Sequence, residues 1–391
     1  MQSLLKLGYL ALFFNVRIDP ASALKFLLRF QTDSLHPRKL MLQFDQPPAN
    51  ICLIRLSALG DVTHAVPVLR AIQRHWPQSR VTWICSPLEH KLLSLLDGVR
   101  FVVVDKKSGW RGYWRLKRQL AAERFDVLLQ MQTSARANFT GACVKADIKL
   151  GWDKKRARDF HRLFMTHAIP ETWHEHQVQG HLSFARSIGL DAEQPAWDFP
   201  ITASAAAFVE RVIPAQRRVL VISPCSNHPA RNWRARRYAA VADYAAREHG
   251  MTVVLSGGPS VLEATLGAAI ESAMQTEVIN LIGKDTLPQL VALLKRADLV
   301  ISPDSGPSHL ANAVATPVIA LHASTWSLRS GPYNSLDLCV DKFAAAAQKF
   351  RATKPDRLRW GTRIENAGVM DLIEVEDVIE RLEVAVNRLP S

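Results

Sequence analysis

The sequence predicts an α/β protein built from two doubly wound, parallel-sheet domains, and two observations support this prediction. Short runs of aliphatic and β-branched residues alternate with longer segments of helical periodicity, which is the pattern of βαβ units in a parallel sheet covered on both faces. The alternation occurs in two series, separated by a stretch rich in proline and small residues. The chain has 391 residues, 48% of them hydrophobic, which is enough for two domains of ordinary size.

We expect a first domain over residues 49–205 and a second over 206–370, with the boundary in the stretch between residues 195 and 216. Helical segments such as 66–75 and 113–122 separate the strands of the first domain. A helix over 371–391 ends the chain, and one position expected for it is against the first domain. The predicted strands are 51–56, 81–85, 101–104 and 126–130 in the first series, and 219–223, 252–256, 278–281, 299–302 and 318–321 in the second.

Residues 1–48 form an apolar and basic extension with helical character. The stretch from residue 4 to 16 is apolar except for Lys6 and Asn15, and it is shorter than the roughly 20 residues needed to span a bilayer. A secretory signal is disfavoured because the strongly basic start of such a signal is missing. Two interpretations stay open, a helix pair on a membrane surface and a helix pair packed on the main body.

The net charge indicates the kind of partner, and the cysteines indicate the cellular compartment. A formal net charge of +13 predicts an anionic partner, which could be a nucleotide, a nucleic acid or an acidic lipid. The five cysteines are odd in number and contain no CxxC pair, so we expect a reducing compartment, by default the cytoplasm.

The sequence lacks the motifs of several common cofactor, nucleotide and metal sites. Neither domain carries GxGxxG or GxxxxGK[ST], so the dinucleotide and ATP-cradling fingerprints are absent. His174, Glu175, His176 and His181 lack the HExxH spacing, so we expect no metal there.

The turn after the predicted strand 299–302 is the strongest candidate for a binding site. It delivers Ser302-Pro303-Asp304-Ser305-Gly306-Pro307-Ser308-His309 to the start of an alanine-rich helix. Free N–H groups and the helix dipole make such a start an anion site. Asp304 and Ser305 can cap the helix, Gly306 permits close approach, and His309 can donate to a phosphate. The structural alternative is a well-capped helix without a ligand.

A second turn follows the first predicted strand and contains Gly60 and Asp61. Ligands of doubly wound sheets lie outside the carboxyl ends of the strands, so the cleft between two such domains is the expected site. A carboxylate at this position can take a proton from a sugar hydroxyl. The alternative is that Asp61 only caps a helix.

Together with a third segment, Arg231-Asn232-Trp233, these two turns resemble the ADP-heptose:lipopolysaccharide heptosyltransferases of glycosyltransferase family 9. The resemblance covers most of residues 50–335, and the Asp304 to His309 turn is its most specific element. It implies the two-domain GT-B fold, with Rossmann-like domains facing across a cleft. It also implies inverting transfer of a heptose from ADP-heptose to the Kdo and heptose inner core of lipopolysaccharide, at the cytoplasmic face of the inner membrane and without an obligatory metal.

The resemblance also implies roles for single residues. Asp61 matches the catalytic base of the family. Arg231 stands where relatives commonly have lysine, and its planar fork is not equivalent to an ammonium group. The residues matched to donor binding are Ser223, Ser226, Arg231, Glu263, Asp285, Thr286, Asp304, Ser305, Gly306 and His309.

Binding of an acidic lipopolysaccharide acceptor calls for cations near Asp61. A solvated basic face is the alternative for each candidate, and nucleic-acid binding is disfavoured because no motif for it is present. The acceptor candidates are Gly60, Gln132, Arg136, Arg156 and Arg158, with Arg111, Arg115, Lys117 and Arg118 beside Trp110, Tyr113 and Trp114 as a further group.

Two other functions stay open from the sequence. One is transfer of a different sugar, or transfer to a later acceptor, within the same family. The other is a catalytically weak relative that binds nucleotide sugars or acts as a membrane-associated partner.

Overall fold

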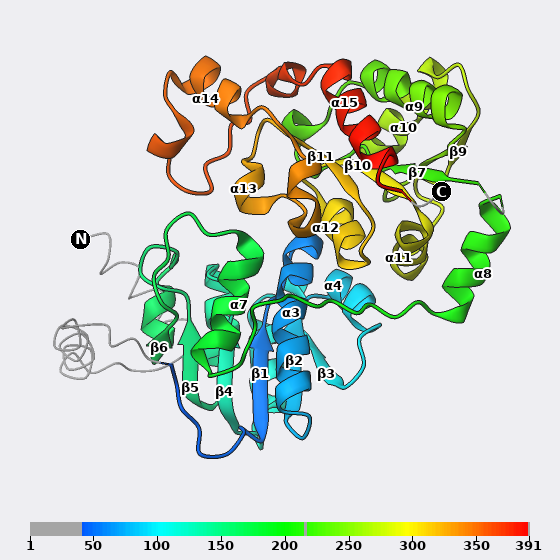
Figure 1. Ribbon diagram of the computed structural model, residues 1–391. Helices are drawn as coiled ribbons and strands as arrows, with labels where there is room; N and C mark the ends of the chain where they lie inside the picture. The colour runs from blue at the N-terminus through cyan, green and yellow to red at the C-terminus, as the bar shows by residue number, and fades with distance from the viewer. Residues whose placement is uncertain (1–40, 215–216, 390–391) are drawn as a thin grey trace. The chain divides into compact units, whose positions relative to one another are not determined.

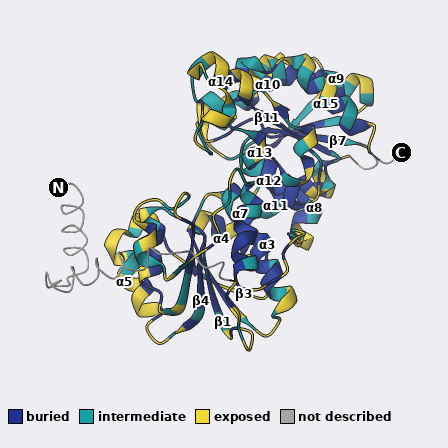
Figure 2. Ribbon diagram, turned by 60° about the vertical axis from the view of Figure 1, so that its left-hand side comes forward, coloured by how far each residue is buried: buried dark blue, intermediate teal, exposed yellow. Residues whose placement is uncertain are grey.

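The computed structural model describes residues 41–214 and 217–389. Two six-stranded sheets form its framework, with strand orders β3-β2-β1-β4-β5-β6 and β12-β11-β10-β7-β8-β9 (Figure 1). Every strand pair in both sheets is parallel. Helices cover the sheets, and the strands at the centre of each sheet are buried (Figure 2). The predicted α/β fold with two doubly wound parallel sheets is confirmed.

The first sheet contains the four strands predicted from the sequence and two additional ones, of six and two residues. Its central strand is β1, where the side chains of Ile51 to Ile54 are fully buried. The strands are β1 (Asn50–Ile54), β2 (Arg80–Cys85), β3 (Val99–Val103), β4 (Phe125–Gln130), β5 (Ala146–Gly151) and β6 (His167–Ala168). The helices of this part are α3 (Leu59–His75), α4 (Pro87–Leu93), α5 (Gly109–Gln119), α6 (Ala135–Ala142) and α7 (Gln177–Ser187).

Helix α3 begins at Leu59, beside Gly60 and Asp61, and contains the predicted helical segment 66–75. Nearly all of its residues from Gly60 to Ile72 are buried. A helix buried on most sides shows no amphipathic stripe, so its first two turns gave no periodic signal. The Gly60–Asp61 turn is therefore the first turn of α3 itself.

The second sheet contains the five predicted strands and the short strand β12. Its strands are β7 (Val219–Ile222), β8 (Thr252–Leu255), β9 (Val278–Asn280), β10 (Leu299–Pro303), β11 (Val318–His322) and β12 (Val340–Asp341). The helices around it are α8 (Ala203–Val212), α9 (Ala235–His249), α10 (Val261–Ala273), α11 (Leu287–Arg296), α12 (Gly306–Ala313), α13 (Ser327–Ser330), α14 (Phe343–Arg351) and α15 (Val375–Val386).

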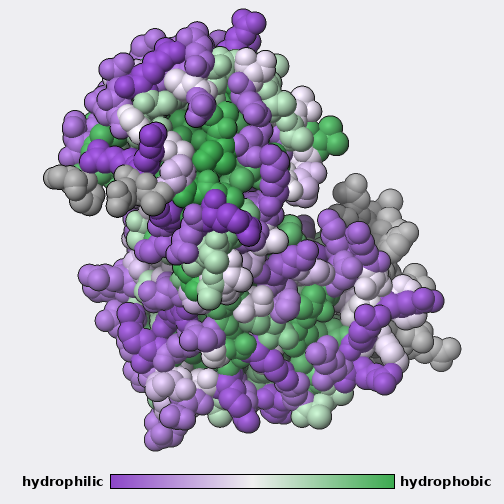
Figure 3. Space-filling view, turned by 90° about the vertical axis from the view of Figure 1, so that its right-hand side faces the viewer, coloured by the Kyte–Doolittle hydropathy of each residue, from purple (hydrophilic) through white to green (hydrophobic). Residues whose placement is uncertain are grey.

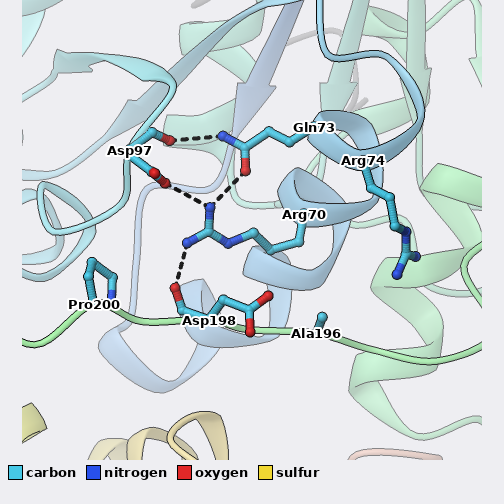
Figure 4. A pocket seen from close by; sticks show the side chains of 7 residues that line it. All are labelled: Arg70, Gln73, Arg74, Asp97, Ala196, Asp198 and Pro200. Atoms are coloured by element: carbon cyan, nitrogen blue, oxygen red, sulfur yellow. Dashed lines mark hydrogen bonds and ion pairs between the residues drawn. The ribbon is translucent and has the colours of Figure 1, made fainter.

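The segment between the two sheets contains helix α8, which lies within the expected boundary stretch of residues 195–216. A division after residue 205 would cut α8, which packs as one unit on α11. The preceding linker is fastened to α3, because Arg70 donates to the carbonyl oxygens of Trp197 at 3.1 Å and Asp198 at 2.5 Å. Arg70 and Asp198 line a pocket of about 450 Å³ in which Arg70 also pairs with Asp97 (Figure 4). The two carbonyl contacts of Arg70 fasten the linker to α3.

The C-terminal helix does not pack against the first domain, which was one position expected for it. The buried face of α15, with Val378, Leu382 and Ala385, belongs to the core of the second sheet. Glu383 on the same helix accepts from the Tyr244 hydroxyl at 3.0 Å. Helix α15 thus packs on the second domain and not on the first.

Most of the predicted N-terminal extension, residues 1–40, lies outside the described residues. The described chain is anchored at Leu42, which is buried and whose N–H donates to the Ser187 carbonyl at 2.7 Å. None of the described helices combines the length and the apolar character that crossing a membrane requires. On the face that includes α8, apolar atoms gather over part of the second domain and hydrophilic atoms cover most of the rest (Figure 3).

Candidate active site

The two turns singled out from the sequence meet in the structure. A Cβ atom added at Gly60 would lie 2.6 Å from Cδ2 of His309 and 3.5 Å from Cα of Gly306. The start of α3 in the first domain and the start of α12 in the second therefore touch through two glycines. A side chain at residue 60 would separate them, because real Cβ contacts are not this short.

Asp61 stands at the third position of α3, close to the end of β1. Its carboxylate accepts from the Ala58 N–H at 3.2 Å and pairs with Arg55 Nη2 at 2.7 Å. Burial opposes ionisation, but Arg55 and the Ala58 N–H together lower the pKa of Asp61 below its usual value. About a third of the side-chain surface, 34%, stays accessible. Asp61 is thus both a helix cap and an ionised carboxylate that a hydroxyl can reach.

Two of the predicted acceptor residues shape the loop that carries Asp61. Gln132 Oε1 accepts from the Leu56 N–H at 2.8 Å. Arg136 donates to Ser57 Oγ at 3.0 Å and to Ser86 Oγ at 3.2 Å. These contacts engage Gln132 and Arg136 as supports of the β1–α3 loop.

The other two predicted acceptor arginines, Arg156 and Arg158, differ in their contacts. Arg156 pairs with Asp153 and with Glu175 Oε2 at 3.0 Å, and its guanidinium lies over the Trp152 ring at 4.7 Å. That network engages Arg156 as a structural ion pair. Arg158 is exposed, and in the described part of the chain no carboxylate forms an ion pair with it.

The turn before α12 has the local geometry that its sequence predicts. Ser305 is the N-cap, and Ser308 Oγ donates to the Ser305 carbonyl at 2.7 Å. The Asp304 carboxylate accepts from Ser330 Oγ at 3.3 Å and lies 3.5 Å from His309 Nε2. Burial opposes its ionisation, but the His309 hydrogen bond and the neighbouring imidazoles hold the pKa of Asp304 well below its usual range. The carboxylate is thus fixed and charged at the start of the helix.

A chain of hydrogen bonds joins the two turns. The Gln177 amide has one orientation that satisfies both of its ends, with Nε2 donating to His64 Nδ1 at 3.2 Å and Oε1 accepting from Arg329 Nη2 at 2.7 Å. His64 Nε2 lies 3.2 Å from His309 Nδ1. Burial lowers the pKa of His64 well below its usual value, so the ring is neutral and Nε2 carries the proton. The hydrogen bonds therefore all run in one direction, with Arg329 as the first N–H donor and Asp304 as the last acceptor.

The three residues after β7 that were matched to binding of the sugar donor each have a different partner. Ser223 accepts at its carbonyl from Ser302 Oγ at 2.9 Å, which ties the ends of β7 and β10 together. Ser226 donates its N–H to Asn232 Oδ1 at 2.7 Å. Arg231 Nη2 pairs with Glu365 Oε1 at 2.6 Å. An anion binding to Arg231 would compete with that carboxylate.

The remaining donor candidates lie at the ends of β8 and β9. Glu263 Oε1 accepts from the Gly258 N–H at 2.7 Å and thereby holds the turn before α10. Burial raises the pKa of Asp285 to about 6, although Ser256 Oγ lies within 3.5 Å of its carboxylate. Thr286 is the N-cap of α11. All three sit at the carboxyl edge of the second sheet, where a doubly wound domain binds its ligand.

Sequence reasoning missed the polar residues between the two turns. Gln177 is the first residue of α7, and Arg329 lies in the short helix α13. Neither stands in a recognisable motif, and only the fold brings them to His64. Across residues 41–214 and 217–389, no group of three ligand-type side chains is arranged to hold a metal ion.

Comparison with known proteins identifies the family of this chain. The sequence profile of glycosyltransferase family 9 (heptosyltransferase) matches residues 113–358. The lipopolysaccharide core heptosyltransferase OpsX of Haemophilus influenzae is 37% identical over 340 residues, covering 87% of this chain and 98% of the relative.

Two solved structures share the fold. A family 9 glycosyltransferase of Veillonella parvula superposes with a TM-score of 0.72 at 21% identity, over 87% of this chain and 97% of the other. E. coli heptosyltransferase WaaC, solved with ADP-2-deoxy-2-fluoro heptose, superposes with a TM-score of 0.59 at 18% identity, over 74% and 97%. The chain, with its two parallel sheets and its paired turns, therefore belongs to glycosyltransferase family 9, the heptosyltransferases.

Proposed function

We propose that this glycosyltransferase moves a heptose from ADP-heptose to the inner core of lipopolysaccharide. The observation that carries the proposal is the contact between the Asp61 turn and the Asp304 to His309 turn. It puts a reachable carboxylate next to an anion-binding helix start. Supporting it, the relative OpsX is a lipopolysaccharide core heptosyltransferase, and WaaC was solved with an ADP-heptose analogue.

In this proposal Asp61 acts as the general base of a single displacement. Its carboxylate is ionised and accepts the proton of the acceptor hydroxyl as that oxygen attacks the anomeric carbon of the heptose. The bond from the anomeric carbon to the phosphate oxygen breaks, and ADP leaves with the electron pair. Attack opposite to the leaving group inverts the configuration of that carbon.

The second domain stabilises the departing diphosphate. The N-terminus of α12 offers free N–H groups and the positive end of its dipole. Arg231 adds a fixed cation once the diphosphate replaces Glu365 as its partner. Transfer without a metal cofactor is part of the proposal, because these groups supply the positive charge.

A panel of nucleotide sugars tests the donor. Purified full-length protein is incubated with a Kdo-bearing lipid A acceptor and either ADP-heptose, ADP-glucose or a UDP-hexose, and nucleotide release and the glycolipid mass are followed. We expect release of ADP and a mass gain of one heptose with ADP-heptose. Transfer from another donor, with ADP-heptose unused, would overturn the heptose assignment.

We also propose that the enzyme works at the cytoplasmic face of the inner membrane, with α5 as its contact. Trp110 and Trp114 lie one turn apart and are 63% and 60% exposed, and only Leu116 on this helix is buried. Arg111 and Arg118 lie over the two indole rings at 5.8 and 5.6 Å. The cations in and just before α5 form no ion pair with any described residue. They are Lys106, Lys107, Arg111, Arg115, Lys117 and Arg118.

Exposed indoles beside unpaired cations fit the interface of an anionic bilayer. Flotation with vesicles containing phosphatidylglycerol tests this contact, with pure phosphatidylcholine vesicles as the reference. We expect salt-sensitive binding to the anionic vesicles that falls when Trp110 and Trp114 are both changed to Ser.

The matched control changes two exposed apolar residues on another helix, Val261 and Leu262 of α10, to Ser. That variant should float as the unchanged protein does. Equal flotation of the Trp110/Trp114 variant and the unchanged protein would show that α5 is not the contact.

A further inference from the structure

Arg329 is a cation in the interior of the site that forms no direct ion pair with a carboxylate of the described residues. Its guanidinium meets one polar partner, the amide oxygen of Gln177, at 2.7 Å from Nη2 and 3.1 Å from Nη1. Within the part of the chain that the structure describes, no carboxylate forms an ion pair with it. A partly buried charge without a partner is unfavourable, so a protein keeps one where a ligand completes it.

Arg329 lies between the two turns, because Gln177 joins it to His64 of α3 and the next residue, Ser330, donates to the Asp304 carboxylate at 3.3 Å. Burial lowers its pKa, and the carboxylates of Asp61 and Asp304 both act on it through space in the opposite direction. Arg158 of the first domain and Arg363 of the second lower it further by repulsion. Arg158 and Arg363 are thus close enough to Arg329 to repel it, and Arg329 is close enough to Asp61 and Asp304 to be attracted by both.

The guanidinium is held in place from two sides. Gln177 belongs to the first domain, whereas Arg329 belongs to the second, so the hydrogen bond crosses between them. A Cβ atom added at Gly361 would lie 3.0 Å from Arg329 Nε, so the backbone there packs directly on the guanidinium. Two of its five N–H donors face Gln177, which leaves donors in a fixed planar fork for a ligand.

We propose that Arg329 binds a substrate oxyanion, a phosphate or a carboxylate, at a position between Asp61 and Asp304. The proposal rests on the proposed function, because that function supplies both possible sources. One source is the diphosphate of the donor, and the other is an acidic group of the acceptor. In either case Gln177 positions the fork, and the anion forms a direct ion pair with it.

Binding measurements on full-length Arg329→Met and Arg329→Lys distinguish the two sources without requiring turnover. Calorimetry gives the Kd of ADP and, separately, the Kd of a soluble, O-deacylated Kdo-bearing lipid A. Removing a charge-assisted hydrogen bond should raise one of these Kd values on the order of 10- to 100-fold in Arg329→Met. Arg329→Lys should recover only part of the loss, because it keeps the charge without the fork.

Arg247→Gln is the matched control, because it removes one positive charge from the exposed surface of α9. Its two Kd values should equal those of the unchanged protein, and thermal unfolding of all variants should confirm that they fold.

A raised Kd for ADP assigns the site to the donor, and a raised Kd for the lipid assigns it to the acceptor. Unchanged values for both ligands in folded Arg329→Met would overturn the proposal. If the unchanged protein binds ADP but transfers no heptose, the proposed function fails while the role of Arg329 is still decided by these Kd values.

Discussion

Arg55 and Asp61 show how a single ion pair prepares and restrains the proposed base. The 2.7 Å contact keeps Asp61 ionised, so the carboxylate can receive a proton at neutral pH. The same contact lowers its basicity, because the pair favours the charged form. An acceptor hydroxyl that hydrogen-bonds to Asp61 would therefore share the carboxylate with Arg55.

Gly60 lies at a close approach between the two domains, and it gives a stability prediction. In Gly60→Ala the new methyl group would lie 2.6 Å from the His309 ring, so the ring and the start of α12 must shift. We expect a loss of about 1–3 kcal/mol in the free energy of unfolding, as for overpacked cores, together with reduced transfer. Chemical denaturation followed by circular dichroism measures the first effect.

Gly306→Ala is the matched control at the same contact. Its methyl group would lie 3.5 Å from Leu59 Cβ, an ordinary van der Waals distance. We expect its free energy of unfolding to change by less than about 1 kcal/mol, since a tolerated alanine also restricts the unfolded chain. A Gly60→Ala protein as stable as Gly306→Ala would contradict the close approach.

Single residues could be predicted from the sequence where they lie in the turns that follow strands. Asp304 could be singled out because it directly follows β10, and Asp61 and His309 because they lie at the start of the helices that follow β1 and β10. The role of Arg156 could not, because its partners Asp153 and Glu175 are brought to it only by the fold.

His176 at the start of α7 links that helix to the second domain and gives a pH prediction. Its Nδ1 accepts from the Val178 N–H at 3.1 Å, and its Nε2 donates to the Gly331 carbonyl at 2.9 Å. Burial lowers the pKa of His176 from 6.5 to about 4. Between these values the unfolded chain binds a proton that the folded chain does not, so stability falls as the pH falls.

His176→Asn removes this titration and keeps a residue that caps helices well. Between pH 7.5 and 5 we expect the unchanged protein to lose about 2 kcal/mol more of its free energy of unfolding than the variant loses. Urea denaturation at the two pH values measures the difference. Parallel pH profiles of the two proteins would show that His176 is not kept neutral by burial.

The elements were predictable to the extent that their patterns are local. Buried strands such as β1 and β10 appear as short aliphatic runs, and all nine predicted strands are present. The start of α3 and the position of α15 were not predictable from such patterns. An apolar stripe shows that a helix is buried on one side, but it does not show which surface it packs against.

Across the whole molecule, the site depends on contacts between residues far apart in the chain. The carboxyl edges of the two sheets each carry one turn, and the hydrogen bonds from Arg329 through Gln177, His64 and His309 to Asp304 pass between the domains more than once. The two-domain class could be predicted from the repeated alternation of strands and helices. This connection could not, because it requires the relative placement of two separately folded sheets.

The central claim is that Asp61 takes the proton of the acceptor while the second domain holds the donor. Transfer from ADP-heptose by Asp61→Asn and by the unchanged protein, measured with the Kd of ADP on the same samples, tests it most directly. Asparagine keeps the size of the side chain but cannot accept the proton. We predict a loss of transfer on the order of 10²- to 10⁴-fold, with an ADP Kd that stays the same. Transfer by Asp61→Asn at the rate of the unchanged protein would contradict the account.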